Sequence, residues 1–232
     1  DGQAATCEDF VRAMEDGGNI DLTQFRLWYE QAGTPRVRAL LSHDAATGRV
    51  DLVLSQIIPP TPGQPEKRPM AIPIRVALFD RESRANHGDE TLMLTRSEQR
   101  FTFQHVATAP VLSINRGFSA PVIVDTNRSQ ADLAFLSAHD DDPFARYEAM
   151  QKLCVRHLIK AVGGELEERA RDVERDAISQ ALEAILPDDQ LDDLMRGELM
   201  VLPATGYLSE QMAVSDPAAL HAEREGLKAW LG

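Results

Sequence analysis

The hydrophobic period changes twice along this chain, from a helical period to a strand period and back. Apolar residues first recur every three to four positions, alternate from about residue 36, and return to helical spacing after about residue 128. A period near 3.6 is typical of an amphipathic helix, and a period of two of a half-buried strand. We therefore predict three domains or parts of domains, 1–35, 36–127 and 128–232.

The first segment is predicted to form two short helices. Thr6 can cap the first, which ends at Gly17 and Gly18, and the second starts near Asp21 and ends at a Gly33 cap. The apolar positions of these helices are Phe10, Val11, Met14, Leu22, Phe25, Trp28 and Tyr29. Two helices this short cannot bury so much aromatic surface against each other, so we expect them to need a partner.

The second segment is predicted to form an antiparallel β-sandwich of short strands. Turn residues at 46–48 and 86–88 separate the runs, and Pro73 makes its strand an edge strand or a bulged one. The proline-rich stretch 59–65 is interpreted as a stiff, extended crossover within the domain rather than a recognition ligand. The alternating positions are Val50, Leu52, Leu54, Ile72, Ile74, Val76, Leu78, Phe101 and Phe103.

The third segment is predicted to be an α-helical, solenoid-like array. Ser129 with Asp132 forms a capping box, and Asp142-Pro143 and Asp216-Pro217 are two further helix starts. One long helix is expected to stop at 163–164 and a second at Pro187.

Composition narrows the class of protein. A net charge of −13 with no Lys/Arg run longer than two argues against a nucleic acid or anionic membrane as partner. No apolar run approaches the roughly 18 residues that a membrane span needs. Cys7 and Cys154 are expected to be reduced, partly buried thiols in a cytoplasmic protein, although a disulfide stays open.

The sequence contains none of the common catalytic motifs. None of the six histidines begins H-E-x-x-H, and no phosphate loop or G-x-S-x-G elbow occurs. Cys154 and His157 are interpreted as a buried thiol beside a surface histidine, and the acidic run 139–142 as a helix N-terminus. Carboxylates and arginines over 165–176 are interpreted as a solvated, ion-paired helix face. We therefore predict no catalytic, metal-binding or cofactor-binding residue in this chain.

Several strings, in their order, resemble the bacterial aminopeptidase N family of zinc exopeptidases. They are Thr6–Asp16, Asp21–Tyr29, Thr34–Pro35, Pro59–Lys67 and Gly117–Val122. The resemblance implies that residues 1–35 end a thermolysin-like catalytic domain, 36–127 form its small β-sandwich, and 128–232 begin a large helical domain. The family's H-E-x-x-H and G-A-M-E-N motifs are not in this sequence. Arg12–Asp16 shares letters with the second motif but is assigned no role.

The resemblance implies that the parent is a metallopeptidase, a zinc-dependent hydrolase that removes N-terminal residues from peptides. This chain would then be a non-catalytic fragment that braces the catalytic and helical domains, with the rest of the parent as its partner. The alternative is a stand-alone binding or scaffolding module, and an active enzyme with an unrecognised site is the least favoured reading. A fragment should leave the faces around Phe10, Phe25 and Trp28 apolar, whereas a module should cover them with polar residues.

Overall fold

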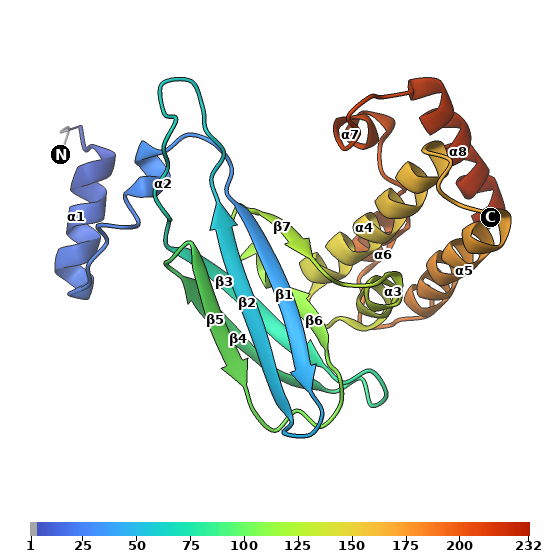
Figure 1. Cartoon of the computed structure of the whole chain (residues 1–232), viewed down its shortest axis with the longest axis horizontal. Coiled ribbons are helices and arrows are strands. Elements are labelled where there is room, and N and C mark those ends of the chain that lie inside the picture. The colour runs from blue at the N-terminus through green and yellow to red at the C-terminus, as the bar shows by residue number, and fades with distance from the viewer. Residues whose placement is uncertain (1–3) are drawn as a thin grey trace. The chain divides into compact units, whose positions relative to one another are not determined.

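The computed structural model describes residues 4–232, whose elements are labelled in Figure 1. The chain forms two compact units, which are described separately. The first consists of the chain up to Ile74 together with 91–107 and 119–127. The second consists of 75–90, 108–118 and 128–232. The boundaries of these units differ from those of the three predicted ranges. The division into domains at 1–35, 36–127 and 128–232 therefore remains a prediction.

The first predicted helix is confirmed and the second is much shorter than expected. Helix α1 spans Cys7–Gly18, and a capping box between Thr6 and Asp9 starts it. Helix α2 spans only Leu27–Glu30. Most of the stretch from Asp21 forms turns instead, and Gly33, at φ +98°, lies three residues beyond the end of α2. The predicted cap at Gly33 is therefore wrong.

Side chains from the α2 region hold it to neighbouring backbone of the first unit. The Gln24 amide donates to the carbonyls of Pro69 at 2.9 Å and Thr95 at 2.6 Å. The Trp28 indole donates to the carbonyl of Ala71 at 2.9 Å. Each bond joins positions more than 40 residues apart, so the tertiary structure fixes this segment where helix propensity does not.

The larger sheet lies in the first unit and has the order β5-β2-β1-β7. Strand β2 buries Val50, Leu52 and Leu54 on one face, as the alternating pattern predicts. Strands β1 and β7 are parallel, which departs from the predicted antiparallel arrangement at this edge. The strands span Arg36–Asp44 (β1), Arg49–Ile57 (β2), Glu98–Phe103 (β5) and Ile123–Thr126 (β7).

The smaller sheet has the order β4-β3-β6, and together the sheets form a sandwich-like Ig fold. Its central strand is β3, so of the two alternatives predicted for the strand that holds Pro73, an edge strand or a bulged one, the edge strand is wrong. Pairing of β3 with β6 covers only 76–79, which leaves Pro73 outside that ladder, where its missing N–H breaks no bond to β6. The strands span Ile72–Phe79 (β3), Asn86–Leu94 (β4) and Val111–Ile114 (β6).

One predicted turn is confirmed and the other is wrong. Residues 45–48 turn between β1 and β2, with Gly48 at φ +65°. Asn86–Gly88 lies instead within β4, because the chain has already reversed in the second unit at Asp80. The Asp80 carboxylate accepts the backbone N–H of Glu82 at 3.1 Å and of Ser83 at 2.7 Å, as in an Asx turn.

The proline-rich connection is a tight turn rather than an extended crossover. Thr61 and Gln64 exchange backbone hydrogen bonds of 3.1 and 2.9 Å around Pro62-Gly63. Gly63 has φ +79°, which a type II turn requires of its second central residue. The connection does join two strands of one domain, but its prolines shape a reversal instead of a stiff spacer.

The helical segment is confirmed as an array, and its predicted starts are correct. Ser129 caps α3 through a capping box with Asp132, and Asp142 and Asp216 cap α4 and α8, each followed by proline. Helices α6 and α7 are additional to those predicted. The helices span Gln130–His139 (α3), Pro143–Val162 (α4), Glu168–Ile185 (α5), Asp193–Met200 (α6), Thr205–Glu210 (α7) and Pro217–Leu231 (α8).

The core of the second unit combines these helices with the ends of two strands. Phe79 of β3 and Val111 of β6 belong to the same buried cluster as Leu136 of α3 and Leu153 of α4. A short 3₁₀ segment, η1 (Arg116–Phe118), follows β6 and packs on α4. This part of the sandwich therefore shares one hydrophobic core with the helical array.

The two thiols lie in different surroundings. Cys7 is exposed at the start of α1, so the expectation of partial burial is wrong there, whereas Cys154 is buried in α4. Burial raises the pKa of the Cys154 thiol to about 12. Both cysteines are free.

Candidate functional site

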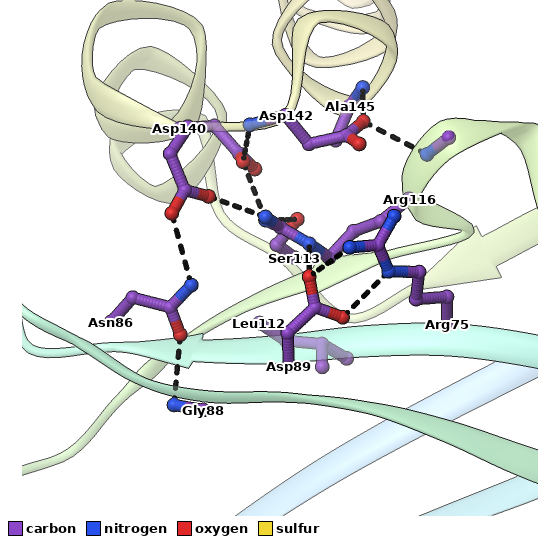
Figure 2. A network of polar contacts seen from close by, with 12 residues as sticks. Arg75, Asn86, Gly88, Asp89, Leu112, Ser113, Arg116, Asp140, Asp142 and Ala145 are labelled. Carbon is purple, nitrogen blue, oxygen red and sulfur yellow. Dashed lines mark hydrogen bonds and ion pairs between the residues drawn. The ribbon is translucent and has the colours of Figure 1, made fainter.

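The most elaborate polar site of the second unit surrounds the guanidinium of Arg116, whose side chain is only 4% exposed. Its Nε lies 3.1 Å from a carboxylate oxygen of Asp89, and its Nη1 lies 2.6 Å from Asp140. Its Nη2 pairs with Asp141, and Nη1 also donates to the Ser113 hydroxyl at 3.1 Å. Figure 2 shows how these groups converge from the strands and from the helices.

The acidic groups reach Arg116 because the chain between α3 and α4 turns directly beside η1. Asp142 accepts the backbone N–H of Ala145 at 2.8 Å as the cap of α4, and that of Gly117 at 2.9 Å. Gly117 has φ +59°, a conformation that glycine adopts at little cost. One carboxylate thus ties the helix start to the η1 backbone.

Further polar side chains contact the carboxylates that surround Arg116 (Figure 2). Arg75 of β3 pairs with Asp89 of β4 at 2.7 Å. The Asn86 amide donates to Asp141 at 3.1 Å and accepts the Gly88 N–H at 2.9 Å. Strands β3 and β4, segment η1 and the α3–α4 turn are therefore joined by one network, which we call the Arg116 network.

The pKa directions follow from burial and from the opposed charges. Burial raises the pKa of Asp140, which its bonds to Ser113, to the Asp142 N–H and to Arg116 only partly offset. Burial disfavours the charged form of Arg116 and acts to lower its pKa. The neighbouring carboxylates outweigh burial and raise the pKa of the guanidinium. For Asp141, hydrogen bonds from Arg116 and Asn86 outweigh burial and lower its pKa.

This arrangement suits a structural clamp better than acid–base chemistry. Both oxygens of Asp89 and the three guanidinium nitrogens of Arg116 are occupied by protein partners. Removing one member of a buried ion pair typically costs about 3–5 kcal/mol, because the remaining charge loses its partner. The network therefore makes the relative position of the strands and the first array helices within this unit costly to change.

The interpretation of the acidic run 139–142 as a helix N-terminus is correct only in part. Asp142 does cap a helix, as predicted, but Asp140 and Asp141 pair with Arg116 instead of simply favouring a helix N-terminus. The partner lies 24 residues earlier in the chain, with a strand and a helix between them. No local pattern reveals such a pairing.

The expectation of a surface histidine beside Cys154 is wrong. His157 is 1% exposed, and its Nδ1 lies 3.2 Å from Glu174 of α5. Burial lowers the pKa of His157, which the Glu174 carboxylate only partly offsets. Glu174 also pairs with Lys160 at 2.7 Å, so it joins α4 to α5.

The prediction that the charged face of α5 is solvated is wrong at Glu174, which is only 9% exposed. Arg171 of the same face pairs with Glu223 of α8 at 2.5 Å. These charges connect helices of the array instead of pairing only along their own helix.

Residues 4–232 contain neither a cluster of metal ligands nor a membrane-spanning helix. No group of three or more His, Cys, Asp or Glu side chains in this range is placed to hold a metal ion. Within the same range, no helix combines the length and the apolar character that crossing a bilayer demands. In the first unit, Glu15, from the stretch that shares letters with an exopeptidase motif, pairs with Arg26 at 2.7 Å.

Comparison with protein families divides the chain between two models. A domain of unknown function, DUF3458, described as an Ig-like fold, matches residues 33–127. A second, DUF3458_C, described as ARM repeats, matches residues 130–232. These descriptions agree with the two sheets and with the helical array.

Comparison with individual proteins finds relatives along nearly the whole chain. The chain is 35% identical to aminopeptidase N of Escherichia coli, over 98% of this chain and 27% of that protein. It is 36% identical to aminopeptidase N of Caulobacter vibrioides, over 98% of this chain and 26% of that protein. A crystal structure of Legionella pneumophila aminopeptidase A in complex with aspartic acid matches with a TM-score of 0.84 and 27% identity, over 100% of this chain and 26% of that one. The chain thus spans about a quarter of the length of these relatives.

Proposed function

We propose that this chain, which is homologous to bacterial aminopeptidase N over about 27% of the length of those proteins, is a non-catalytic part of such an aminopeptidase. The observation that carries the proposal is the match of 98% of the chain to one continuous quarter of the relatives. In this proposal residues 1–35 end a catalytic domain, 36–127 form a β-sandwich domain, and 128–232 begin a helical domain. The whole protein would remove N-terminal residues from peptides.

Zinc belongs to the proposed parent protein and not to this chain. The described residues do not fit such an ion, because no three candidate ligands lie together among them. We therefore assign peptide hydrolysis to the remainder of the parent. The other domains of that parent are the partner we propose, and the cytoplasm its location.

The Arg116 network supports a bracing role. It holds two strands of the Ig-like fold and the start of the helical array in one compact unit. A brace must resist displacement, and a buried, multiply paired arginine makes displacement costly. Within the first unit, Gln24 and Trp28 hold the α2 region to backbone carbonyls in a similar manner.

The exposed apolar side chains favour a part of a larger protein over a stand-alone module. In the first unit Phe10 is 58% and Phe25 37% exposed, whereas Trp28 is partly buried. In the helical array Leu194 is 77% and Val214 82% exposed. A stand-alone module would be expected to carry polar residues at such positions. We propose that further domains of the parent cover them.

The proposal is tested by measuring the mass and the activity of the source protein. Antibodies against this chain should detect, in the source organism, a protein several times heavier than its 25.7 kDa. That protein should hydrolyse aminoacyl-coumarin substrates in a zinc-dependent manner, whereas the 232-residue chain with added zinc should not. A native product of 25.7 kDa would favour the stand-alone module, and zinc-dependent hydrolysis by the isolated chain would contradict the non-catalytic assignment.

A further inference from the structure

Helix α5 is held in the helical array by two different kinds of contact. Its buried residues, all within the described part of the chain, are Glu174, Ile178, Ala181 and Ile185. The last three belong to the hydrophobic core of the second unit, whereas Glu174 is polar. The C-terminal half of α5 is therefore anchored by apolar packing, and the turns before Ile178 depend on polar contacts.

The start of α5 is weakly fixed by its own backbone. Gly164, in the connection from α4, has φ +68°, a conformation that glycine adopts at little cost. Glu167, the described residue at the N-cap of α5, makes no side-chain capping bond, unlike the caps of α3, α4 and α8. A helix start without such a bond is less stable than a capped one. Arg171 pairs with Glu223 of α8, but these side chains are 24% and 25% exposed.

The buried polar contact joins Glu174 to two side chains of α4. One carboxylate oxygen lies 3.2 Å from Nδ1 of His157, and the other lies 2.7 Å from the Lys160 ammonium. His157 is only 1% exposed. Because an ionised carboxylate only accepts hydrogen bonds, Nδ1 carries the proton of the neutral ring. The atom that acid protonates is therefore Nε2.

The charged groups around this histidine come from three helices. Lys160 belongs to α4 and shares the carboxylate partner of His157. Arg171 and Arg175 of α5 act on the ring as further positive charges, and Glu223 of α8 pairs with Arg171. Helix α3, which packs on both α4 and α5, adds apolar side chains to the adjoining core. A single carboxylate would thus have to balance an imidazolium as well as the ammonium that it already pairs with.

The pKa of His157 follows the same balance. Burial lowers this pKa from 6.5, the bond to Glu174 offsets the shift only in part, and Arg175 and Arg171 lower it further. The closed contact between α4 and α5 therefore takes up a proton less readily than a solvated histidine does. Acid consequently favours the state in which this contact is broken.

We propose that residues 168–175, about the first two turns of α5, form an acid-released segment: protonation of His157 separates them from α4 while 178–185 stay packed. The contact is fully stable above about pH 6.5 and weakens as the pH falls below that value, because the folded pKa is depressed. The inference concerns the helical array alone, so it stands or falls independently of the proposed peptidase parent.

Amide hydrogen exchange of the 232-residue chain, followed by NMR, tests the proposal. Between about pH 7.5 and about pH 5.5, protection of the amides in 171–175, corrected for intrinsic exchange, should fall about three- to tenfold, because opening takes up one proton. Protection in 178–185 should not change. His157→Gln keeps a donor toward Glu174 but cannot be protonated, so it should abolish the pH dependence. His221→Gln, at an exposed position of α8, is the matched control and should retain it.

The proton itself is followed through the ¹⁵N shifts of the His157 imidazole in the unmodified chain. Their midpoint should lie below 6.5 and coincide with the loss of protection in 171–175. Protection in 171–175 that does not depend on pH, an equal loss in 178–185, or a loss that persists in folded His157→Gln overturns the proposal. If His157→Gln fails to fold by circular dichroism, the imidazole titration decides. A midpoint at or above 6.5 then overturns the proposal, and a lower midpoint that coincides with the loss of protection supports it.

Discussion

Helices α1 and α3 both begin with a capping box but pack in different environments. In α1 the Thr6 hydroxyl accepts the Asp9 N–H at 3.1 Å, and in α3 the Ser129 hydroxyl accepts the Asp132 N–H at 3.1 Å. Helix α1 nevertheless buries only Val11 over 12 residues, whereas α3 buries four residues over 10. A capping box therefore determines where a helix starts and says nothing of what it will pack against.

The difference lies in partners that are distant in sequence. Helix α3 packs on α4 and α5, and the chain that follows it enters the Arg116 network. Helix α1 is linked to α2 chiefly by Arg26, which pairs with Glu8 at 2.9 Å and Glu15 at 2.7 Å. The side chains of Arg26 and Glu15 are 20% and 22% exposed, so solvent screens this pair more than it screens the buried pairs of Arg116. We therefore expect α1 to open locally at a lower free energy than α3.

The largest expected effect comes from removing the arginine that pairs with each region. Arg26 pairs with Glu15 of α1, and Arg116 pairs with Asp140 directly after α3. Arg116→Met should lower the free energy of unfolding by about 3–5 kcal/mol, because it leaves the buried Asp140 carboxylate without its ionic partner. Arg26→Met should lower the free energy of unfolding less, since Glu8 and Glu15 are 49% and 22% exposed and keep contact with solvent. Urea unfolding followed by circular dichroism measures both. A comparable loss in the two variants would show that α1 is held as firmly as α3.

A smaller effect is expected from truncating one apolar side chain on each helix. Leu136→Ala in α3 should cost about 2–5 kcal/mol, because it leaves a cavity in the core. Phe10→Ala in α1 should change stability by no more than about 0.5 kcal/mol, because this ring is 58% exposed. The same unfolding measurement applies. A large loss for Phe10→Ala would mean that the isolated chain buries this ring in solution.

Removing the caps should separate local from global stability. Ser129→Ala and Thr6→Ala each remove one N-cap bond, worth about 1 kcal/mol to its helix. The Ser129→Ala loss should appear in global unfolding because α3 is part of the core. Thr6→Ala should instead accelerate hydrogen exchange within 7–18 and leave global unfolding unchanged. Equal global losses would contradict the difference between the two helices.

The smallest effect is a pH dependence confined to the α1–α2 link. Hydrogen bonds from Arg26 and the Leu22 N–H lower the pKa of Glu15 from 4.5 to about 2. Because the folded pKa is depressed, the link contributes fully above pH 4.5 and is lost as the pH falls toward 2. The ¹³C shift of the Glu15 carboxyl should titrate near 2, and Arg26→Gln should move that midpoint toward 4.5. A midpoint near 4.5 in the unmodified chain would show that the pair does not form in solution.

Helix starts and strand alternation were predictable from neighbouring residues, although the local patterns at Gly33 and at 86–88 were misinterpreted. The caps at Thr6, Ser129, Asp142 and Asp216 each act within three residues, and the alternation at 50–54 reflects the geometry of one strand. The three-part order of helices, sheets and helical array follows from the same periodicities.

Features governed by distant partners were not predictable in this way. The stretch after Asp21 has a helical apolar spacing, yet Gln24 and Trp28 hold it by bonds to carbonyls more than 40 residues away. The burial of Asp140 and His157 could not be predicted from neighbouring residues. Their ionic partners, Arg116 and Glu174, lie in other elements of the fold. The Arg116 network became visible only when the fold brought these segments together.

The contrast between the two cysteines makes the chain ready for site-specific spectroscopy. A maleimide or nitroxide reagent should modify the exposed Cys7 and leave Cys154 untouched while the protein is folded, because a buried thiol with a pKa of about 12 supplies almost no thiolate. A probe attached at Cys7 would sit at the first residue of α1. Without any engineered mutation, it could therefore report on the motion of α1.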